Sequence, residues 1–488
     1  MKRYVKTLPA LLFLFFFSTI GAQEIKYKFE AGGAFSGKET PPTWHLSNKQ
    51  GVSGKEAGFG YIRTGFSGFH TLTKSKLDIN WGADIIAGSH LTSSVYIQQA
   101  FADINWKMLA LSVGQKERWG ELKNHRLSTG GLVESGNARP IPQIRIEVPE
   151  YYDFFGTKDW FRIRGHIAYG IFTDGNWQKD WTAANAKYTK DVRYHSKAIF
   201  FKIGKEEKFP LSMEWGLQMT AQFGGKAYNK AKGTKSKAPT RLKDYYKAFI
   251  PGSGDSKNAG IDHNNIAGNH LGSWHLALNW KEKDWSIRTY YEHLFDDHSQ
   301  MFMEYGLWNE QLVGIELNLE KFHWIKAVVL EYYNLKNQSG PVYHDTTNDI
   351  PDQISCRDDN YNHGWYNGWF NYGMTIGTPL ATSPIYNKDG VLECYNNRVE
   401  AFHIGIEGEP TNEIGYRMLL THSNNWGSYP VPFTDIKRNT AALIELSYKP
   451  EKLKGWALKV SYACDNGGLL GKTCSGMLTI SKCGIIKF

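Results

Sequence analysis

The sequence predicts an all-β protein that forms a single transmembrane β-barrel of about 18 antiparallel strands. Three observations predict this fold class. Apolar and polar residues alternate over unusually long segments, short and long connections alternate along the chain, and residues 1–22 have the pattern of an export signal.

The alternation is clearest at residues 161–172, which read FRIRGHIAYGIF. One face of this strand carries Phe161, Ile163, Ile167, Tyr169 and Ile171, and the other carries Arg162, Arg164 and His166. Such segments exceed the roughly five or six residues of an ordinary strand and fit the roughly 9–11 that a tilted strand needs to cross a bilayer. The apolar face then contacts lipid, and the charged face contacts a wet lumen.

The spacing of these segments supports closure into a barrel. We expect strands at 26–36, 55–70, 76–88, 94–105, 107–117, 141–149, 160–173, 194–205, 211–223, 272–281, 284–295, 311–320, 325–336, 399–408, 413–423, 440–449, 454–464 and 475–488. Every second connection is short, as periplasmic turns are, and the others are mostly long, up to 337–398. A secreted propeller or paired sandwiches is the alternative, but the segments are too long and show no internal repeat.

Both ends of the chain carry signals for export to the outer membrane. Lys2, Arg3 and Lys6 precede the apolar run LPALLFLFFFSTIGA, which predicts a signal peptide at 1–22 and a barrel domain at 23–488. An N-terminal membrane anchor is the alternative, but the run is short for a span. The last strand ends on Phe488, an aromatic residue typical of barrels that the barrel-assembly machinery recognises.

Composition and motifs narrow the function. The net charge is +9, but an exported barrel is a poor candidate for binding nucleic acid. The sequence has no Cys-x-x-Cys, GxSxG, Walker or HExxH motif and no His-rich metal spacing. We therefore expect no catalytic residues, no metal and no cofactor.

Residues 112–177 contain SGNARPIP and FGTKDWFRIRGHIAYGIFTDGNW, and this stretch resembles the Wzi capsule-assembly family. TPPTWHLSNKQG, SVYIQQAFADINW, NYGMTIGTPL and DNGGLLGK are similar too. The resemblance implies an outer-membrane barrel, and the characterised branch is a surface lectin that holds capsular polysaccharide on the cell. That branch also has a periplasmic helical bundle, for which this chain has too little non-strand sequence before Trp44.

Loop 337–398 is the main candidate for glycan contact. Its segment DDNYNHGWYNGWFNYG places aromatic rings among Asn, Asp and Gly, a mixture that stacks on sugar rings and satisfies hydroxyl groups. The alternative is that these aromatic side chains pack among themselves. The candidate contacts, with one from loop 424–439, are Tyr361, Trp365, Tyr366, Trp369, Tyr372 and Trp426. Trp177 and Trp181 lie on the same outer side.

Loop 224–271 carries many cations and few acids. Such a loop would attract a polyanion, for example an acidic capsule or lipopolysaccharide phosphate. The alternative is a solvated loop with no dedicated ligand. The cations are Lys226, Lys230, Lys232, Lys235, Lys237, Arg241, Lys243 and Lys247.

The segment KERWGELKNHRL mixes charges of both signs, which predicts a connection that folds into or over the lumen. Charge-assisted bonds to the barrel wall would hold it there. It either plugs the lumen or lines a pathway through it. The expected network comprises Lys116, Glu117, Arg118, Glu121, Arg139, Arg145, Glu147, Arg162 and Arg164.

Two disulfides are possible in an exported chain. Cys464 and Cys474 flank the last outer loop, and Cys356 and Cys394 both lie in loop 337–398. Together these features predict a non-catalytic barrel that binds surface polysaccharide and supports capsule assembly or retention. A porin or carbohydrate channel is the first alternative, and an enzyme acting on outer-membrane lipid or glycan is the second.

Overall fold

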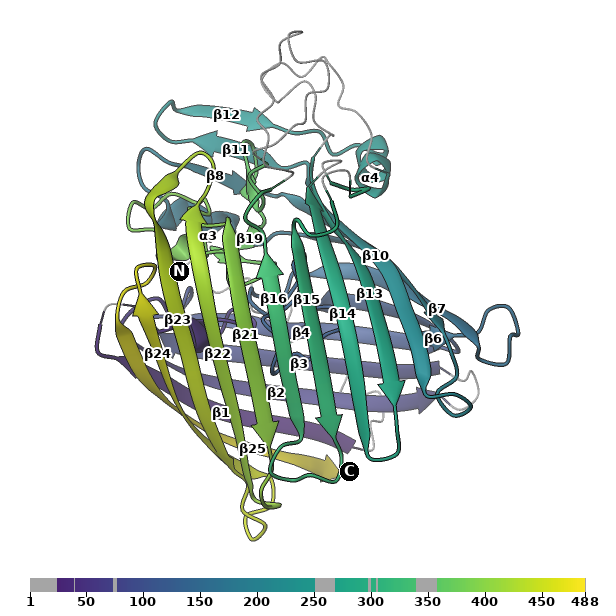
Figure 1. Cartoon of the computed structure of the whole chain (residues 1–488). Coiled ribbons are helices and arrows are strands. Elements are labelled where there is room, and N and C mark those ends of the chain that lie inside the picture. The colour runs from purple at the N-terminus through teal and green to yellow at the C-terminus, as the bar shows by residue number, and fades with distance from the viewer. Residues whose placement is uncertain are drawn as a thin grey trace.

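The computed structural model describes residues 24–38, 40–72, 77–250, 268–296, 300–303, 306–338 and 358–487. Within them, an 18-stranded antiparallel sheet closes on itself (Figure 1). The first strand, β1 (Glu24–Ser36), pairs with both β2 (Gly58–Leu72) and the last strand, β25 (Thr473–Lys487). The predicted barrel is therefore confirmed. The predicted signal peptide and Phe488 lie outside the described residues.

The other wall strands pair with their neighbours in chain order. They are β3 (Leu77–Ser89), β4 (Val95–Trp106), β5 (Leu109–Gln115), β6 (Gln143–Tyr152), β7 (Phe161–Ile171), β9 (Arg193–Ile203), β10 (Leu211–Phe223), β13 (Asn269–Lys281), β14 (Trp285–Asp296), β15 (Gln311–Leu319), β16 (Ala327–Asn334), β21 (Val399–Gly408), β22 (Ile414–Gly427), β23 (Pro432–Tyr448) and β24 (Trp456–Gly467).

The sequence places these strands well because one face of each contacts lipid. In β7, Ile167 is 45 % exposed on the outer face, whereas the neighbouring His166 and Ala168 are buried. The largest error is the start of β23, predicted at 440 and found at Pro432. The first residues of β23 are mostly exposed and polar, so the alternation that marks the other strands is missing there. No helix in the described part of the chain is long and apolar enough to cross a membrane.

The longest connections, and the short loop 2, lie at the end of the barrel opposite Lys487, the outer end. We number them loop 1 (37–57), loop 2 (90–94), loop 3 (116–142), loop 4 (172–192), loop 5 (224–268), loop 6 (297–310) and loop 7 (335–398). They hold α2 (Thr43–Leu46), α3 (Gly175–Trp181), α4 (Leu242–Phe249), η1 (Pro384–Tyr386), the sheet β8 (Lys187–Lys190), β11 (Lys226–Asn229) and β12 (Thr234–Lys237), and two small hairpins, β17 (Asn362–His363) with β18 (Asn367–Gly368) and β19 (Phe370–Asn371) with β20 (Met374–Thr375). Figure 1 shows β8, β11, β12 and α4 standing above the rim. Among the described residues, no periplasmic helical bundle is present.

The hydrophobic core lies inside the barrel rather than outside it. Its largest cluster joins Leu132 and Val133 of loop 3, Trp369 of loop 7, and Leu271 and Leu312 of the wall. A second cluster joins residues from α2 in loop 1, from loop 3 and from strands β16 to β24. Loops 1, 3 and 7 therefore fill the outer part of the lumen as a packed domain would.

Candidate functional site at the outer mouth of the barrel

Loop 3 crosses the lumen and bonds to opposite parts of the wall. Glu121 accepts from Arg164 of β7 at 2.8 Å, while Lys123 pairs with Glu292 of β14. Arg126 reaches farther, with its Nε 2.6 Å from Glu407 of β21. The loop is therefore anchored on both sides of the cylinder by charge-assisted bonds.

The Glu331 carboxylate of β16 also anchors loop 3, and it accepts several hydrogen bonds. Its carboxylate accepts from the hydroxyl groups of Ser128 (2.5 Å), Thr129 (2.8 Å) and Tyr290 (2.6 Å) and from the Thr129 N–H (2.7 Å). Sequence reasoning missed Glu331, and Glu292 and Glu407 with it. The sequence contained a sign that these acids face the lumen, because each of them falls on the polar face of a wall strand.

Several residues of the expected network do not clamp loop 3. Arg162 lies at the periplasmic turn, where it donates to the Gly204 carbonyl and pairs with Glu206 at 3.5 Å. Arg145 and Glu147 pair with each other along β6 at 2.5 Å. The hydrogen-bond and ion-pair partners of these three residues lie in β6 and in the turn after β9.

The remaining members bond to nearby strands at the start of loop 3. Lys116 pairs with Asp103 at 2.6 Å, Glu117 pairs with Arg63 at 3.1 Å, and Arg118 donates to the Ser112 hydroxyl at 3.1 Å. They fix the point at which the chain turns from β5 into the lumen.

Three of the aromatic candidates in loop 7 are buried. Tyr361 and Trp369 are each 1 % exposed, and Tyr366 is 6 % exposed. The Tyr361 hydroxyl donates to the Leu132 carbonyl and the Trp369 indole N–H to the Val133 carbonyl, both at 2.7 Å. These rings close the mouth by packing on loop 3, so they are not available to stack on a glycan.

The other three candidate rings are only partly covered, and Trp426 lies in β22 rather than in the predicted loop 424–439. Trp365 packs edge-on against Tyr366, with ring centroids 4.5 Å apart. Trp426 is half-buried, with the Lys336 ammonium 4.7 Å from its ring centroid. Tyr372 is half-buried too, and it contacts Arg139 of loop 3 and Trp177 of loop 4.

Half-buried aromatic rings from β4, loop 4 and loop 7, joined by a buried guanidinium from loop 3, form a continuous row that we call the aromatic strip: Tyr96, Arg139, Tyr372, Trp177 and Trp181. The Arg139 guanidinium lies between Tyr96 (3.5 Å) and Tyr372 (4.2 Å). Tyr372 lies 6.0 Å from Trp177, which stacks on Trp181 at 5.4 Å with an interplanar angle of 17°. Sequence reasoning listed Arg139 as a lumen charge, but it packs between rings at the mouth.

Asp174 holds the two halves of the aromatic strip together. Its carboxylate accepts the Tyr372 N–H at 3.1 Å and the Gln178 side-chain N–H at 2.9 Å, and so joins loop 7 to α3. Burial raises the pKa of Asp174 to about 6. The strip is therefore positioned by a buried acid that solvent does not reach.

The cations of loop 5 lie on the hairpin β11–β12 and on α4, above the rim (Figure 1). Strand register places Lys226 directly opposite both Lys190 and Lys237. Lys226 pairs with Asp191 at 2.7 Å, and Lys230 donates to the Lys179 carbonyl at 2.8 Å. The other members are exposed, except for the partly covered Lys247: Lys232, Lys235, Lys237, Arg241 and Lys243. Like charges that lie opposite each other in a sheet repel.

Cys464 and Cys474 form a disulfide beside the last outer loop. Cys394 is a buried free thiol, while its predicted partner Cys356 lies outside the described residues. Cys483 is a free, exposed thiol. Burial raises the pKa of the Cys394 thiol well above its usual range, which keeps it protonated and unreactive.

Thiol labelling of the folded barrel tests this assignment. We expect maleimide to modify Cys483 in detergent, Cys394 only after unfolding, and Cys464 and Cys474 only after unfolding with a reductant. Peptide mass mapping reads out each position. Modification of Cys464 without reductant would contradict the disulfide.

The closed sheet, the lipid-facing apolar residues and the filled lumen define a β-barrel of the outer-membrane type. Among solved structures, the chain is similar to Wzi of Escherichia coli, described as an outer-membrane protein involved in Group 1 capsule assembly and a carbohydrate-binding β-barrel. The TM-score is 0.56 at 13 % identity, covering 97 % of this chain and 86 % of that one.

Other similar barrels are OccAB4 of Acinetobacter baumannii and OccK3 of Pseudomonas aeruginosa. Their TM-scores are 0.46 and 0.47, at 11 % and 12 % identity. The matches cover 96 % of this chain and 99 % of OccAB4, and 95 % of this chain and 96 % of OccK3. No protein-family model matches the chain, and no curated protein matches its sequence. At these identities the likeness shows the fold alone.

Proposed function

We propose that this chain resides in the outer membrane, binds surface polysaccharide at its outer mouth, and supports capsule assembly or retention without catalysis. The observation that carries the proposal is the aromatic strip, displayed on a mouth that the chain's own loops close. A barrel whose lumen is filled by loop 3 and covered by loop 7 meets extracellular molecules on its outer surface.

The chemistry of that surface suits a glycan, especially an acidic one. Trp177, Trp181 and Tyr372 offer ring faces on which the C–H face of a sugar can stack. The Lys55 ammonium lies 5.7 Å from the Trp181 ring centroid, and the lysines of β11 and β12 add a positive field nearby. Stacking would hold the sugar rings, and the cations would favour carboxylates or phosphates along the polymer.

The segment SGNARPIP, on which the resemblance to the capsule-assembly family rests, connects loops at the mouth of the barrel. Asn137 donates to the Thr375 carbonyl at 3.0 Å, and Ser135 donates to the Gly377 carbonyl at 2.7 Å. Gly51 of loop 1 has φ +72°, and a Cβ there would lie 2.5 Å from Arg139 Cγ. This segment therefore joins loops 1, 3 and 7 and contributes Arg139 to the aromatic strip.

The partners follow from this location. Lipid and lipopolysaccharide would surround the wall, and the barrel-assembly machinery would engage β25. A porin or carbohydrate channel would need a continuous aqueous path, which the bonds from loop 3 to β7, β14, β16 and β21 oppose.

Deleting the gene tests the proposal in cells. We expect the deletion strain to make polysaccharide in normal total amount but to release most of it into the medium. The chain supplied from a plasmid should restore attachment. Quantification of cell-bound and free polysaccharide after gentle centrifugation gives the answer, and unchanged attachment in the deletion strain would reject the proposal.

A further inference from the structure

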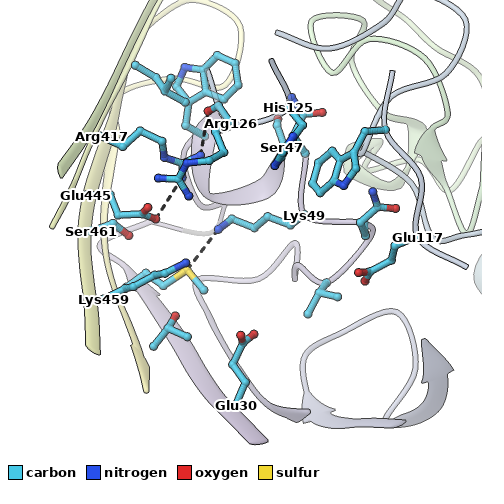
Figure 2. Close-up of a pocket in the computed structure, with 18 of the residues that line it drawn as sticks. Glu30, Ser47, Lys49, Glu117, His125, Arg126, Arg417, Glu445, Lys459 and Ser461 are labelled. Atoms are coloured by element: carbon cyan, nitrogen blue, oxygen red, sulfur yellow. Dashed lines mark hydrogen bonds and ion pairs between the residues drawn. The ribbon is translucent and has the colours of Figure 1, made fainter. Parts of the chain in front are cut away.

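A cavity of about 340 Å³ lies inside the barrel, between loops 1 and 3 and the wall formed by β1, β2 and β22 to β25 (Figure 2). Its wall residues include Tyr61, Arg63 and Met477 toward the outer end, and Lys459 near the start of β24 and Glu445 near the end of β23 toward the periplasmic end. Loops 3 and 7 fill the lumen toward the outside. Because that packing closes the outer side, we expect a ligand to reach the cavity from the periplasm.

Cations outnumber acids in the lining of this cavity. Three carboxylates, those of Glu30, Glu117 and Glu445, face six cations. The cations are Lys28, Lys49, Arg63, Arg126, Arg417 and Lys459. Arg126 and Arg63 also pair with Glu407 and Asp84 outside the lining, so the excess of positive charge lies on the lysines. A cavity with an excess of one sign of charge and low-dielectric walls concentrates ions of the opposite sign.

The carboxylates are already engaged by other cations. Glu445 pairs with Arg417 at 3.1 Å, and Glu30 pairs with Lys28 at 3.0 Å. Glu117 pairs with Arg63, also at 3.1 Å. Among the described residues, no carboxylate lies within ion-pair distance of Lys49 or Lys459. The acceptor of Lys49 is the thioether of Met477, at 3.7 Å, which is a weak one.

Loop 1 fixes Lys49 in this position. Just before it, the His45 ring is bonded to the Ser475 and Ser461 hydroxyls, each at 3.0 Å. Figure 2 shows Lys49 extending across the cavity toward the wall that carries Glu445, Ser461 and Lys459. Burial lowers the pKa of Lys49 to about 8; the Glu445 carboxylate opposes this shift, whereas the neighbouring Arg417 and Lys459 add to it. A bound anion would relieve this repulsion.

We propose that this cavity binds a carboxylate-bearing monosaccharide, a hexuronate, from the periplasmic side. The carboxylate would sit between the Lys49 and Lys459 ammonium groups. The Ser47 and Ser461 hydroxyls line the same space, as does Trp119, whose indole is 40 % exposed and offers a face for the sugar ring. The volume is at the lower end of the roughly 300–1,000 Å³ of small-molecule sites. This inference does not depend on glycan binding at the outer mouth.

Calorimetric titration of the barrel in nanodiscs with glucuronate tests the site. We expect saturable binding, with glucose roughly tenfold weaker because it lacks the charged group. Lys49→Gln and Lys459→Gln should each weaken glucuronate binding by about tenfold, while Lys459→Arg retains it. Lys452→Gln, in the exposed turn after β23, is the matched control and should leave the affinity unchanged. Heat-modified migration in gels checks that each variant is folded.

Three outcomes would overturn the proposal. Equal affinity for glucose and glucuronate would show that the carboxylate is not recognised. Full affinity in folded Lys49→Gln and Lys459→Gln variants would place binding elsewhere. Binding of inorganic phosphate without binding of glucuronate would show that the cavity takes an anion but not a sugar acid.

Discussion

Removing the lumen-crossing part of loop 3 is expected to convert the closed barrel into an open channel. Barrels of 16–18 strands leave an aqueous channel when nothing fills them. Replacing residues 119–135 with a short Gly-Ser linker removes the bonds to Arg164, Glu292 and Glu331 and the packing of Leu132 and Val133 beneath loop 7. In planar bilayers, we expect stable open-channel steps from this variant and none from the intact chain.

A control deletion separates plugging from general damage. Removing residues 231–233, at the tip of the β11–β12 hairpin, shortens an outer loop above the rim and should leave the barrel closed. If the intact chain and this control conduct as well as the loop 3 variant, loop 3 is not a plug.

A point substitution tests a single ion pair between loop 3 and the wall without removing the loop. Lys123→Met leaves the Glu292 side chain, 1 % exposed, without its cation, and we expect a cost of about 3–5 kcal/mol. Adding Glu292→Gln removes the unpaired charge and should recover most of the loss. Thermal unfolding in detergent, followed by heat-modified migration, compares the three chains.

The aromatic strip is expected to carry most of the affinity for polysaccharide. Replacing both Trp177 and Trp181 with Ala removes two stacking faces, each worth about 0.5–1.5 kcal/mol, so we expect affinity to fall by about tenfold. Surface plasmon resonance with the barrel in nanodiscs and the host's purified polysaccharide measures the change.

Trp308→Ala is the matched control for this pair. Trp308 is an outer-loop tryptophan, 72 % exposed, that is not part of the aromatic strip. Its removal should leave the affinity unchanged. Equal losses in the two variants would indicate that any exposed tryptophan contributes, and undiminished binding in the folded double variant would place the glycan site elsewhere.

The sequence predicted the orientation of side chains where two environments, lipid and lumen, alternate regularly along a strand. A wall strand alternates between lipid and lumen, so the faces of residues 161–171 could be read directly, and Arg164 does meet Glu121 inside. The mixed charges of residues 116–126 likewise indicated a segment that needs counter-charges, although Glu292, Glu331 and Glu407 were not identified as the partners.

The sequence could not show which aromatic side chains of the loops are buried and which are exposed. Trp369 and Trp177 are the same residue type in similar Gly- and Asn-containing segments, yet one is buried against loop 3 and the other is half-exposed. The difference depends on which loops meet above the lumen, and those contacts join residues more than 200 positions apart, such as Trp369 and Val133. Lys49 was missed for the same reason, because only the folded loop 1 brings it to the wall.

Glycan binding at the outer mouth is tested most sharply by asking whether the intact, folded barrel binds the polysaccharide of its own host. Equilibrium titration of the chain in nanodiscs should give saturable binding, reduced by covering the outer face with an antibody against the β11–β12 hairpin. An intact barrel that fails to bind this polysaccharide at any concentration, while letting small sugars permeate liposomes, would contradict the account and favour a channel.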